Sequence, residues 1–364
     1  MLLIANAVAQ WPRPIQPPTN TKKQRHVKIL VPRLANRMLV ANFLANFLAV
    51  FVVQTIIFMV DTPMPEETLS KIRWIDTLFL PTAFILPVVL TLFYERPIRH
   101  VLTRLAAGRA VSTGISQIAR RRVLNEPFVL MLLDAALWLL ATVLYPLTIW
   151  IDTQNIALAH RSIYMGLASG LTTVTVAFFL LEHVLQKQLA PVLFPDGRLS
   201  SVPGVLHIRI STRLVAMFLA CGGIPLLSLA YLVYRLGPGP LGQLRLAVFV
   251  NTALFLVIGA TVTLLVARNL TTPIKAIIAG LKRIAVGSFD HPVEVTSNDA
   301  LGYTGDIINE MMAGLRERDH LREALALADE VQRNLLPSEA PCVAGLDIAG
   351  SCIYCEQTGG DYYD

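Results

Sequence analysis

The stretch MLVANFLANFLAVFVVQTIIFMV, residues 38–60, contains no charged residue and is long enough to cross a bilayer as a helix. At a rise of 1.5 Å per residue, about 20 residues cover the ~30 Å of hydrocarbon in a membrane. A soluble core explains such a run less well, because a core helix needs only one apolar stripe. Five further runs of this kind follow, and the sequence predicts six transmembrane helices, the later five at 75–94, 128–150, 163–181, 214–234 and 246–267.

The basic residues alternate between loops. Hydrophobic residues make up 54% of the chain and charged residues only 15%, with a formal net charge of +6. Lys and Arg concentrate before the first run, after the second, after the fourth and after the sixth, for example in the triplet 120–122. This positive-inside bias predicts that the basic segment 1–37 and the C-terminus are both cytoplasmic. A nucleic-acid partner is not expected, because that would place the charges on one folded face.

Asp134 is the acid that lies well inside a predicted span, in the run 128–150. Carboxylates in a membrane are costly and usually face a helix-bundle interior or a water-filled cavity. Two roles remain open for Asp134: a ligand or proton site, and a structural position near the cytoplasmic interface. The spans lack the series of acids and histidines expected of a proton-coupled transporter.

Beyond the sixth run, apolar residues recur at helical spacing in two short segments. Ile274, Ile277, Leu281 and Ile284 are separated by three, four and three residues, and Ile308, Met311 and Leu315 follow the same pattern. Gly287 and Pro292 bracket a connector in which Phe289 and Val293 could fill a core. Two such helices cannot bury their stripes alone, and a parallel dimer would bury them in a four-helix bundle. We expect a homodimer through 267–335.

The region 268–318 resembles a HAMP domain. Pro273 stands where the family has its first-helix proline, and Gly287 where it has the connector glycine. Asp299-Ala-Leu-Gly302 resembles the Asp-Glu-x-Gly start of the second helix, and Asn309 with Met311 resembles a later Asn-x-Met. Ala300 departs from the usual Glu, which would weaken signal coupling. The resemblance implies a signal relay; a pair of juxtamembrane helices without such a role is the alternative.

The last part of the chain reads as a helical linker, 319–337, followed by the segment 338–364. The linker ends at Leu336-Pro337, Leu346–Ala349 predicts a strand, and a glycine pair then precedes Asp361 in GGDYYD. Glycines before an acid let the backbone approach a bound ion or phosphate closely. Cys352-x-x-Cys355 has the spacing of metal ligands but no second pair, so a structural zinc stays a minor alternative.

This segment resembles the start of a SpoIIE-type PPM phosphatase domain. The resemblance rests on Glu330-Val-Gln332, Leu335-Leu-Pro337, Gly345, Ile348-Ala349 and Thr358-Gly-Gly-Asp361-Tyr-Tyr-Asp364. It implies a bacterial protein serine/threonine phosphatase in which Asp361 binds Mn²⁺ or Mg²⁺. The chain ends before the family's remaining metal-binding acids, and one carboxylate cannot hold two metals. We therefore expect a truncated, incomplete domain that does not hydrolyse phosphate esters by itself.

The sequence thus predicts a mostly α-helical protein: a six-helix transmembrane bundle, HAMP helices with a coiled-coil linker, and the incomplete start of an α/β phosphatase domain. The predicted function is signal transduction in the bacterial plasma membrane, with a phosphorylated regulatory protein as the substrate of the longer form. Two alternatives remain: a HAMP receptor driving another effector, such as a nucleotide cyclase, and a transporter.

Overall fold

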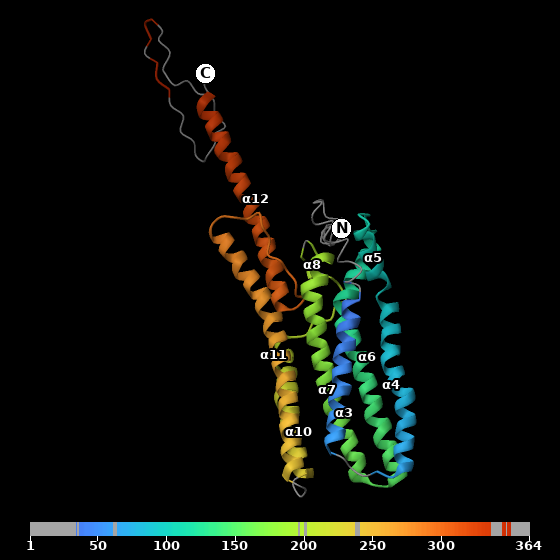
Figure 1. Cartoon of the computed structure of the whole chain (residues 1–364). Coiled ribbons are helices and arrows are strands. Elements are labelled where there is room, and N and C mark those ends of the chain that lie inside the picture. The colour runs from blue at the N-terminus through green and yellow to red at the C-terminus, as the bar shows by residue number, and fades with distance from the viewer. Residues whose placement is uncertain are drawn as a thin grey trace. The chain divides into compact units, whose positions relative to one another are not determined.

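The computed structural model of the chain describes residues 34–335, apart from short gaps at 35, 61–63, 196, 200–201 and 237–240, and also 344–346 and 348–350. These residues form helices joined by turns and loops (Figure 1). The predicted mostly α-helical class is confirmed for this part of the chain. Leu346 and Ile348–Gly350, the described part of the predicted strand region, are not in a strand.

Among the described residues the longer helical elements include two π-helical turns (η). In chain order they are α3 (Arg37–Val60), α4 (Glu66–Tyr94), α5 (Arg96–Ala106), α6 (Thr113–Thr153), α7 (Ile156–Val184), η1 (Leu185–Leu189), α8 (Ala190–Leu193), α9 (Ile210–Phe218), η3 (Leu219–Gly223), α10 (Ile224–Leu236), α11 (Leu241–Ala285) and α12 (Ala300–Leu335).

Five stretches of the described chain are long and apolar enough to cross a membrane. They are Glu66–Tyr94, Thr113–Thr153, Ile156–Leu193, Ile210–Tyr234 and Leu241–Ala285, and they contain the second to sixth predicted spans. The first predicted span, 38–60, lies in α3, whose described apolar part, Arg37–Phe51, is shorter than a span. The structure therefore supports a multi-pass membrane protein with about five membrane-length helices; six is not shown.

The described chain divides into two compact units. The membrane unit contains the described residues up to Ala276 together with Glu294–Gly305. The relay unit contains Ile277–Val293 and the described residues from Asp306 onward. The start of α12 therefore belongs to the membrane unit, although residues of the relay unit precede and follow it in the sequence.

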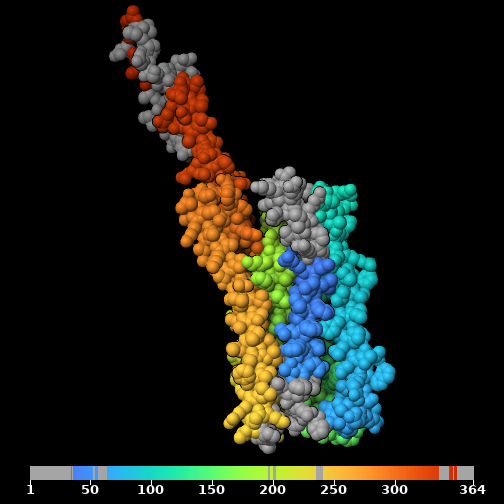
Figure 2. Space-filling view, in the orientation of Figure 1, coloured from blue at the N-terminus to red at the C-terminus, as the bar shows by residue number. Residues whose placement is uncertain are grey.

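Helix α7 is the centre of the membrane unit. It packs against both α3 and α6, and 56% of its most apolar stretch is buried, against 11% for the peripheral helix α4. Figure 2 shows the face of the unit that α3 and α4 form, which carries exposed apolar side chains such as Phe47 and Ile85. Such a face suits lipid, because lipid tails leave apolar side chains in an apolar medium.

Small residues let these helices approach closely. Ala41, Ala45 and Ala49 of α3 lie one turn apart and are all buried. On α7, a Cβ atom at Gly170 would lie 2.9 Å from the Cβ of Trp138, closer than normal packing allows. Small residues at every fourth position are typical of helix contacts in membranes, where backbones pack tightly.

Each π-helical turn directly precedes a proline. Element η1 ends two residues before Pro191, and η3 ends two residues before Pro225. A proline ring in a regular helix clashes with the carbonyl group four residues earlier, and a wider turn relieves the clash. At Pro225 the helix thus contains a π turn, whereas Pro81, Pro87 and Pro146 lie inside helices that continue without a break.

Gly287 ends the first relay helix. Its φ of +77° lies in the left-handed region that favours glycine. The N–H of Gly287 donates to the carbonyl of Ile284, and the N–H of Ser288 donates to the carbonyl of Arg283 at 2.9 Å. This is the geometry of a glycine C-cap, so the connector glycine lies where the sequence predicted it.

Candidate functional site

The segment that leads into α12 is buried in the membrane unit. Val295 lies in the same apolar core as residues of α5, α6, η1 and α8, and 296–299 are all at most 8% exposed. The Asn298 side chain donates to the carbonyl of Leu206 at 3.3 Å. Polar residues are mostly exposed in proteins, so the burial of four consecutive ones is unusual. It indicates that this segment is packed into the membrane unit just before α12 begins.

Asp299 caps α12. Its Oδ1 accepts hydrogen bonds from the backbone N–H of Leu301 at 3.0 Å and of Gly302 at 3.3 Å. An acid at this position satisfies N–H groups that have no partner within the helix and also stabilises the positive end of its dipole.

Gly302 has no room for a side chain. A Cβ atom there would overlap the backbone carbonyl of Ser297. The Asp-x-x-Gly spacing noted in the sequence therefore has two physical reasons. The acid caps the helix, and the glycine leaves room for the backbone of Ser297 to pass close to α12.

The second oxygen of Asp299 belongs to a buried ion triad. Arg213 Nη1 lies 2.6 Å from Glu182 Oε1 and 3.2 Å from Asp299 Oδ2. Glu182 stands near the end of α7 and Arg213 in the first turn of α9, so the triad joins three segments that are far apart in sequence. All three residues are at most 5% exposed.

This triad is not fully satisfied by its partners. Two carboxylates and one guanidinium leave one negative charge when all are ionised. Among the described residues, Nε and Nη1 of Arg213, Oε2 of Glu182 and Oδ2 of Asp299 form no hydrogen bond of good geometry. Burying charged groups costs free energy unless all their polar atoms are hydrogen-bonded. The net stabilisation that this triad gives to the contact between the three segments is therefore small.

Uncharged bonds join α7 to α11 beside the triad. His183 Nδ1 lies 2.8 Å from Asn269 Oδ1, and Asn269 Nδ2 donates to the carbonyl of Phe179 at 3.3 Å. Because Asn269 lies four residues before Pro273, these bonds hold the helix that leads to the relay unit.

Within the relay unit, the side chain of Asn309 forms two hydrogen bonds with the backbone of the connector. The N–H of Val293 donates to Asn309 Oδ1 at 2.6 Å, and Asn309 Nδ2 donates to the carbonyl of Val293 at 3.0 Å. Val293 itself is buried, and a Cβ atom at Gly280 would overlap its Cγ2 atom. The suggestion that Val293 fills a core thus agrees with its burial.

The predicted relay residues divide into buried and exposed groups. Pro273 is buried inside α11, and Ile308 is buried on α12 together with Met312. Ile277 is half-buried. The side chains of Ile274, Leu281 and Met311 are 41–45% exposed in the single chain. Within the single chain Met312 is buried and Met311 is exposed, so the predicted role of Met311 in a dimer stays a prediction.

Asp134 faces the interior of the membrane unit. It is 1% exposed, and its Oδ1 accepts a hydrogen bond from Asn42 Nδ2 of α3 at 3.2 Å. One turn further along, the indole of Trp138 donates to Asn46 Oδ1 at 3.4 Å. These bonds form a polar contact between α3 and α6.

The predicted metal ligand Asp361 and the pair Cys352/Cys355 lie outside the described residues. In the part of the chain that the structure describes, no three His, Cys, Asp or Glu side chains gather as a metal site would require. The predicted Mn²⁺ or Mg²⁺ site at Asp361 therefore stays a prediction.

Sequence reasoning missed the triad. Arg213 was read only as one of the positive charges that set topology, and Glu182 was not singled out. A usable signal was present, because Glu182 is an acid directly beside an apolar span. Its partners lie 31 and 117 positions away along the chain, beyond the reach of local patterns.

Comparisons with known proteins agree with the relay region. Residues 265–317 match the HAMP domain. The chain is 34% identical over 96 residues to the methyl-accepting chemotaxis protein McpA of Bacillus subtilis, covering 26% of this chain and 14% of that protein. It is 25% identical over 321 residues to the uncharacterized protein Rv1320c of Mycobacterium tuberculosis, covering 82% of this chain. A second protein of that organism, Rv1318c, is 27% identical over 213 residues.

The match covers 54% of Rv1320c, so the chain spans about half the length of this relative. No solved structure gives a significant match. The comparisons give no support for a SpoIIE-type phosphatase domain. The chain thus contains a HAMP domain at 265–317, behind helices long and apolar enough to cross a membrane.

Proposed function

We propose that this chain receives a signal in its membrane helices and passes it through the Glu182–Arg213–Asp299 triad to the second HAMP helix. The HAMP domain and the apolar helices indicate a membrane signal-transduction protein. One observation carries the finer proposal: Asp299 caps α12 with one carboxylate oxygen and pairs with Arg213 through the other.

This arrangement links two events mechanically. A shift of α7 relative to α9 would change the distance between Glu182 and Arg213. The distance between Arg213 and Asp299, and with it the strength of their ion pair, would then change as well. Loss of the Asp299 contact alters the cap of α12, where the helix begins. The proposal requires a second arrangement of the triad with similar energy, and the unsatisfied atoms of the observed arrangement are consistent with one.

Hydrogen exchange of the full chain in lipid nanodiscs tests the relay. Arg213→Met should speed amide exchange at 299–304 and also in 306–320 of α12. Arg213→Lys, which keeps the charge, should restore part of the protection. Arg209→Met is the matched control, because Arg209 has the same charge and precedes α9 but is exposed. If amide exchange became faster only within 294–305, the triad would have a structural role alone. That result would contradict the proposed transmission of a signal into α12.

We propose that the chain crosses the inner membrane of a bacterium six times, with its N- and C-termini in the cytoplasm. The alternation of basic loops supports this orientation. Reporter fusions near residues 110 and 200 should read as cytoplasmic, and a periplasmic reading at either place would contradict the topology.

We propose a parallel homodimer through 267–335. HAMP domains commonly act as dimers, and the exposure of Leu281 and Met311 in the single chain supports a partner. In a variant without native cysteines, Leu281→Cys or Ile277→Cys should form a disulfide-linked dimer on oxidation in membranes. A cysteine at Glu310, which is exposed on α12, is a comparison for random collisions. Equal cross-linking at Glu310 and Leu281 would contradict the dimer.

For the output, the proposal remains a Mn²⁺- or Mg²⁺-dependent protein phosphatase acting on a phosphorylated regulatory protein. Its support is the resemblance of 330–364 to the start of such a domain. Reading the coding DNA past codon 364 tests it: an Asp-Gly-rich continuation would support the phosphatase, and a nucleotide-cyclase domain would replace it with the alternative effector.

A further inference from the structure

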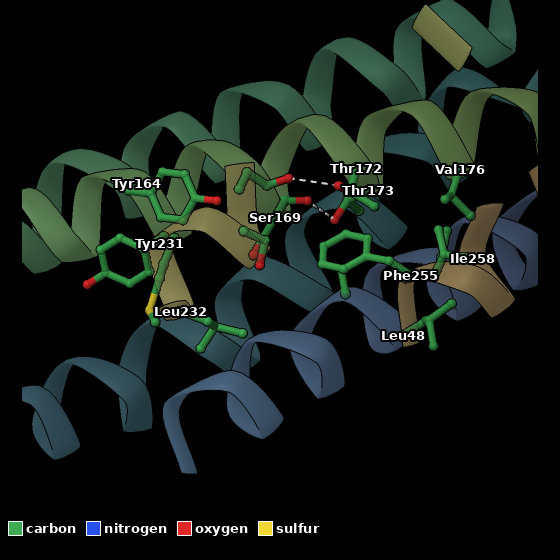
Figure 3. Close-up of a pocket in the computed structure, with 15 residues that line it drawn as sticks. Leu48, Tyr164, Ser169, Thr172, Thr173, Val176, Tyr231, Leu232, Phe255 and Ile258 are labelled. Carbon is green, nitrogen blue, oxygen red and sulfur yellow. Dashed lines mark hydrogen bonds between the residues drawn. The ribbon is translucent and has the colours of Figure 1, made fainter. Parts of the chain in front are cut away.

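A pocket opens among α3, α7, α10 and α11 of the membrane unit. It encloses about 650 Å³ of space, its open mouth included, and Figure 3 shows the side chains that line it. Every lining residue falls within a predicted span. The pocket therefore lies at membrane depth, where lipid-soluble molecules have access and ions do not.

Its walls are mainly apolar. Phe255 and Ile258 of α11 close one end together with Leu48 of α3 and Val176 of α7, as Figure 3 shows. No lining residue carries a charge. An anionic or cationic head group would be buried here without a counter-charge, which costs too much, so the pocket selects against charged ligands.

The other end carries hydroxyl groups beside two stacked aromatic rings. Tyr164 of α7 and Tyr231 of α10 stack with their ring centres 5.0 Å apart. In Figure 3 the hydroxyl of Tyr164 points along the pocket toward Ser169, while that of Tyr231 points the other way. This end of the pocket is therefore amphipathic.

Most other hydroxyl donors at the pocket are already used. The Thr172 and Thr173 hydroxyls donate to the carbonyls of Ala168 and Ser169, and Ser228 donates to Asn251. The Tyr164 hydroxyl is buried near Ser228 but forms no hydrogen bond of good geometry within the described residues. A buried donor without an acceptor is costly, and a ligand oxygen would satisfy it.

We infer that this pocket binds a neutral lipid with one alkyl chain and a carbonyl oxygen, of the kind found in a monoacylglycerol. In this proposal the alkyl chain lies along the open, apolar part of the pocket beside Leu48, Val176 and Ile258, and its carbonyl oxygen accepts a hydrogen bond from Tyr164. This site goes beyond the proposed relay and does not depend on it, because binding can be measured without any output.

Photolabelling of the full chain in phosphatidylcholine nanodiscs tests the site. The probe is a monoacylglycerol with a diazirine in its chain and a terminal alkyne. It should label peptides covering 164–176 and 228–232, and excess unlabelled monoacylglycerol should remove the label. A photoreactive fatty acid, which carries a charge, should label these peptides more weakly.

Two variants and a control make the test specific. Tyr164→Phe removes only the hydroxyl and should reduce labelling roughly fivefold, the loss of about one hydrogen bond. Ala168→Phe should fill the pocket and abolish labelling. Tyr234→Phe is the matched control, since this tyrosine of α10 is 80% exposed and does not line the pocket.

Three results would contradict the inference. Labelling of the lipid-facing helix α4 as strong as that of α7 would show ordinary lipid surrounding the protein. Labelling that neither Tyr164→Phe nor Ala168→Phe lowers would show that the lipid does not occupy the pocket. Equal labelling by the fatty acid would contradict the selection for a neutral head group.

Discussion

Two side chains, Asp299 just before α12 and Asn309 on α12, hold the segment that leads into this helix in different ways. Asp299 lies in the membrane unit and is held by a buried ion pair with Arg213. Asn309 lies in the relay unit and is held by two uncharged hydrogen bonds to the backbone of Val293. Asp299 and Asn309 are ten positions apart in the sequence.

The difference teaches how a relay can combine stability with response. The two hydrogen bonds between the Asn309 amide and the Val293 backbone satisfy both partners and do not depend on an ionised group. A buried ion triad depends on three partners at once, so removing one leaves an uncompensated charge and a large energetic change. The ionic contact therefore suits transmission, and the neutral contact suits local folding.

The largest effect is expected when the ionic contact is broken. Arg213→Met leaves Glu182 and Asp299 buried without a cation and should lower the free energy of unfolding by about 3–5 kcal/mol. Denaturation in mixed detergent micelles measures this change. Arg209→Met should change it by less than about 0.5 kcal/mol, as surface substitutions do. Equal effects from the two variants would show that the triad contributes no special stability.

A smaller effect is expected from crowding the junction. Gly302→Ala places a methyl group against the carbonyl of Ser297 and should cost about 1–3 kcal/mol, with faster amide exchange at 297–304. Gly314→Ala is the control on the same helix, because a Cβ there meets no atom within 4 Å. That change should stabilise α12 by up to about 1 kcal/mol. Stabilisation by Gly302→Ala would contradict the observed close approach.

Breaking the neutral contact should cost less again. Asn309→Ala removes both bonds to Val293 and should destabilise the relay unit by about 1–2 kcal/mol, with faster exchange of the Val293 amide. Exchange at Leu301 should stay unchanged, since its amide is capped by Asp299. If Leu301 responded as strongly as Val293, the two contacts would not be separable, and the comparison between them would fail.

The smallest effect is expected at Gly280. Gly280→Ala places a methyl group against the buried side chain of Val293 and should cost about 1 kcal/mol. Combined with Val293→Ala, it should cost less than the sum of the two single changes, because the smaller side chain makes room for the new methyl group. Strict additivity in the double-mutant cycle would show that these two residues do not share one packing site.

Periodic and local features of the fold were open to prediction from sequence. The long apolar runs predicted helices that the structure contains, and Gly287, Asp299 and Gly302 lie where local turn and cap chemistry requires them. These residues act on neighbours a few positions away. Their roles therefore leave a pattern in the sequence.

Contacts between distant segments were not predictable in this way. Arg213 looks like any positive charge beside a span, and nothing around it indicates Glu182 or Asp299 as a partner. Asp134 was noticed as a costly acid, but its partner Asn42 lies 92 positions earlier. The packing of α3, α6, α7 and α9 against one another creates these contacts, and single-sequence periodicity does not contain that packing.

The pairing of π turns with Pro191 and Pro225 has a consequence for how this chain can vary. A π turn holds one residue more than the regular helix around it, so the span built from α9, η3 and α10 can lose a single residue within Leu219–Gly223 and become regular. In an ordinary span the same deletion would rotate everything beyond it by about 100°. Single-codon deletions should therefore survive in this segment when Pro225 is replaced as well, and orthologues that lack the proline should be one residue shorter there.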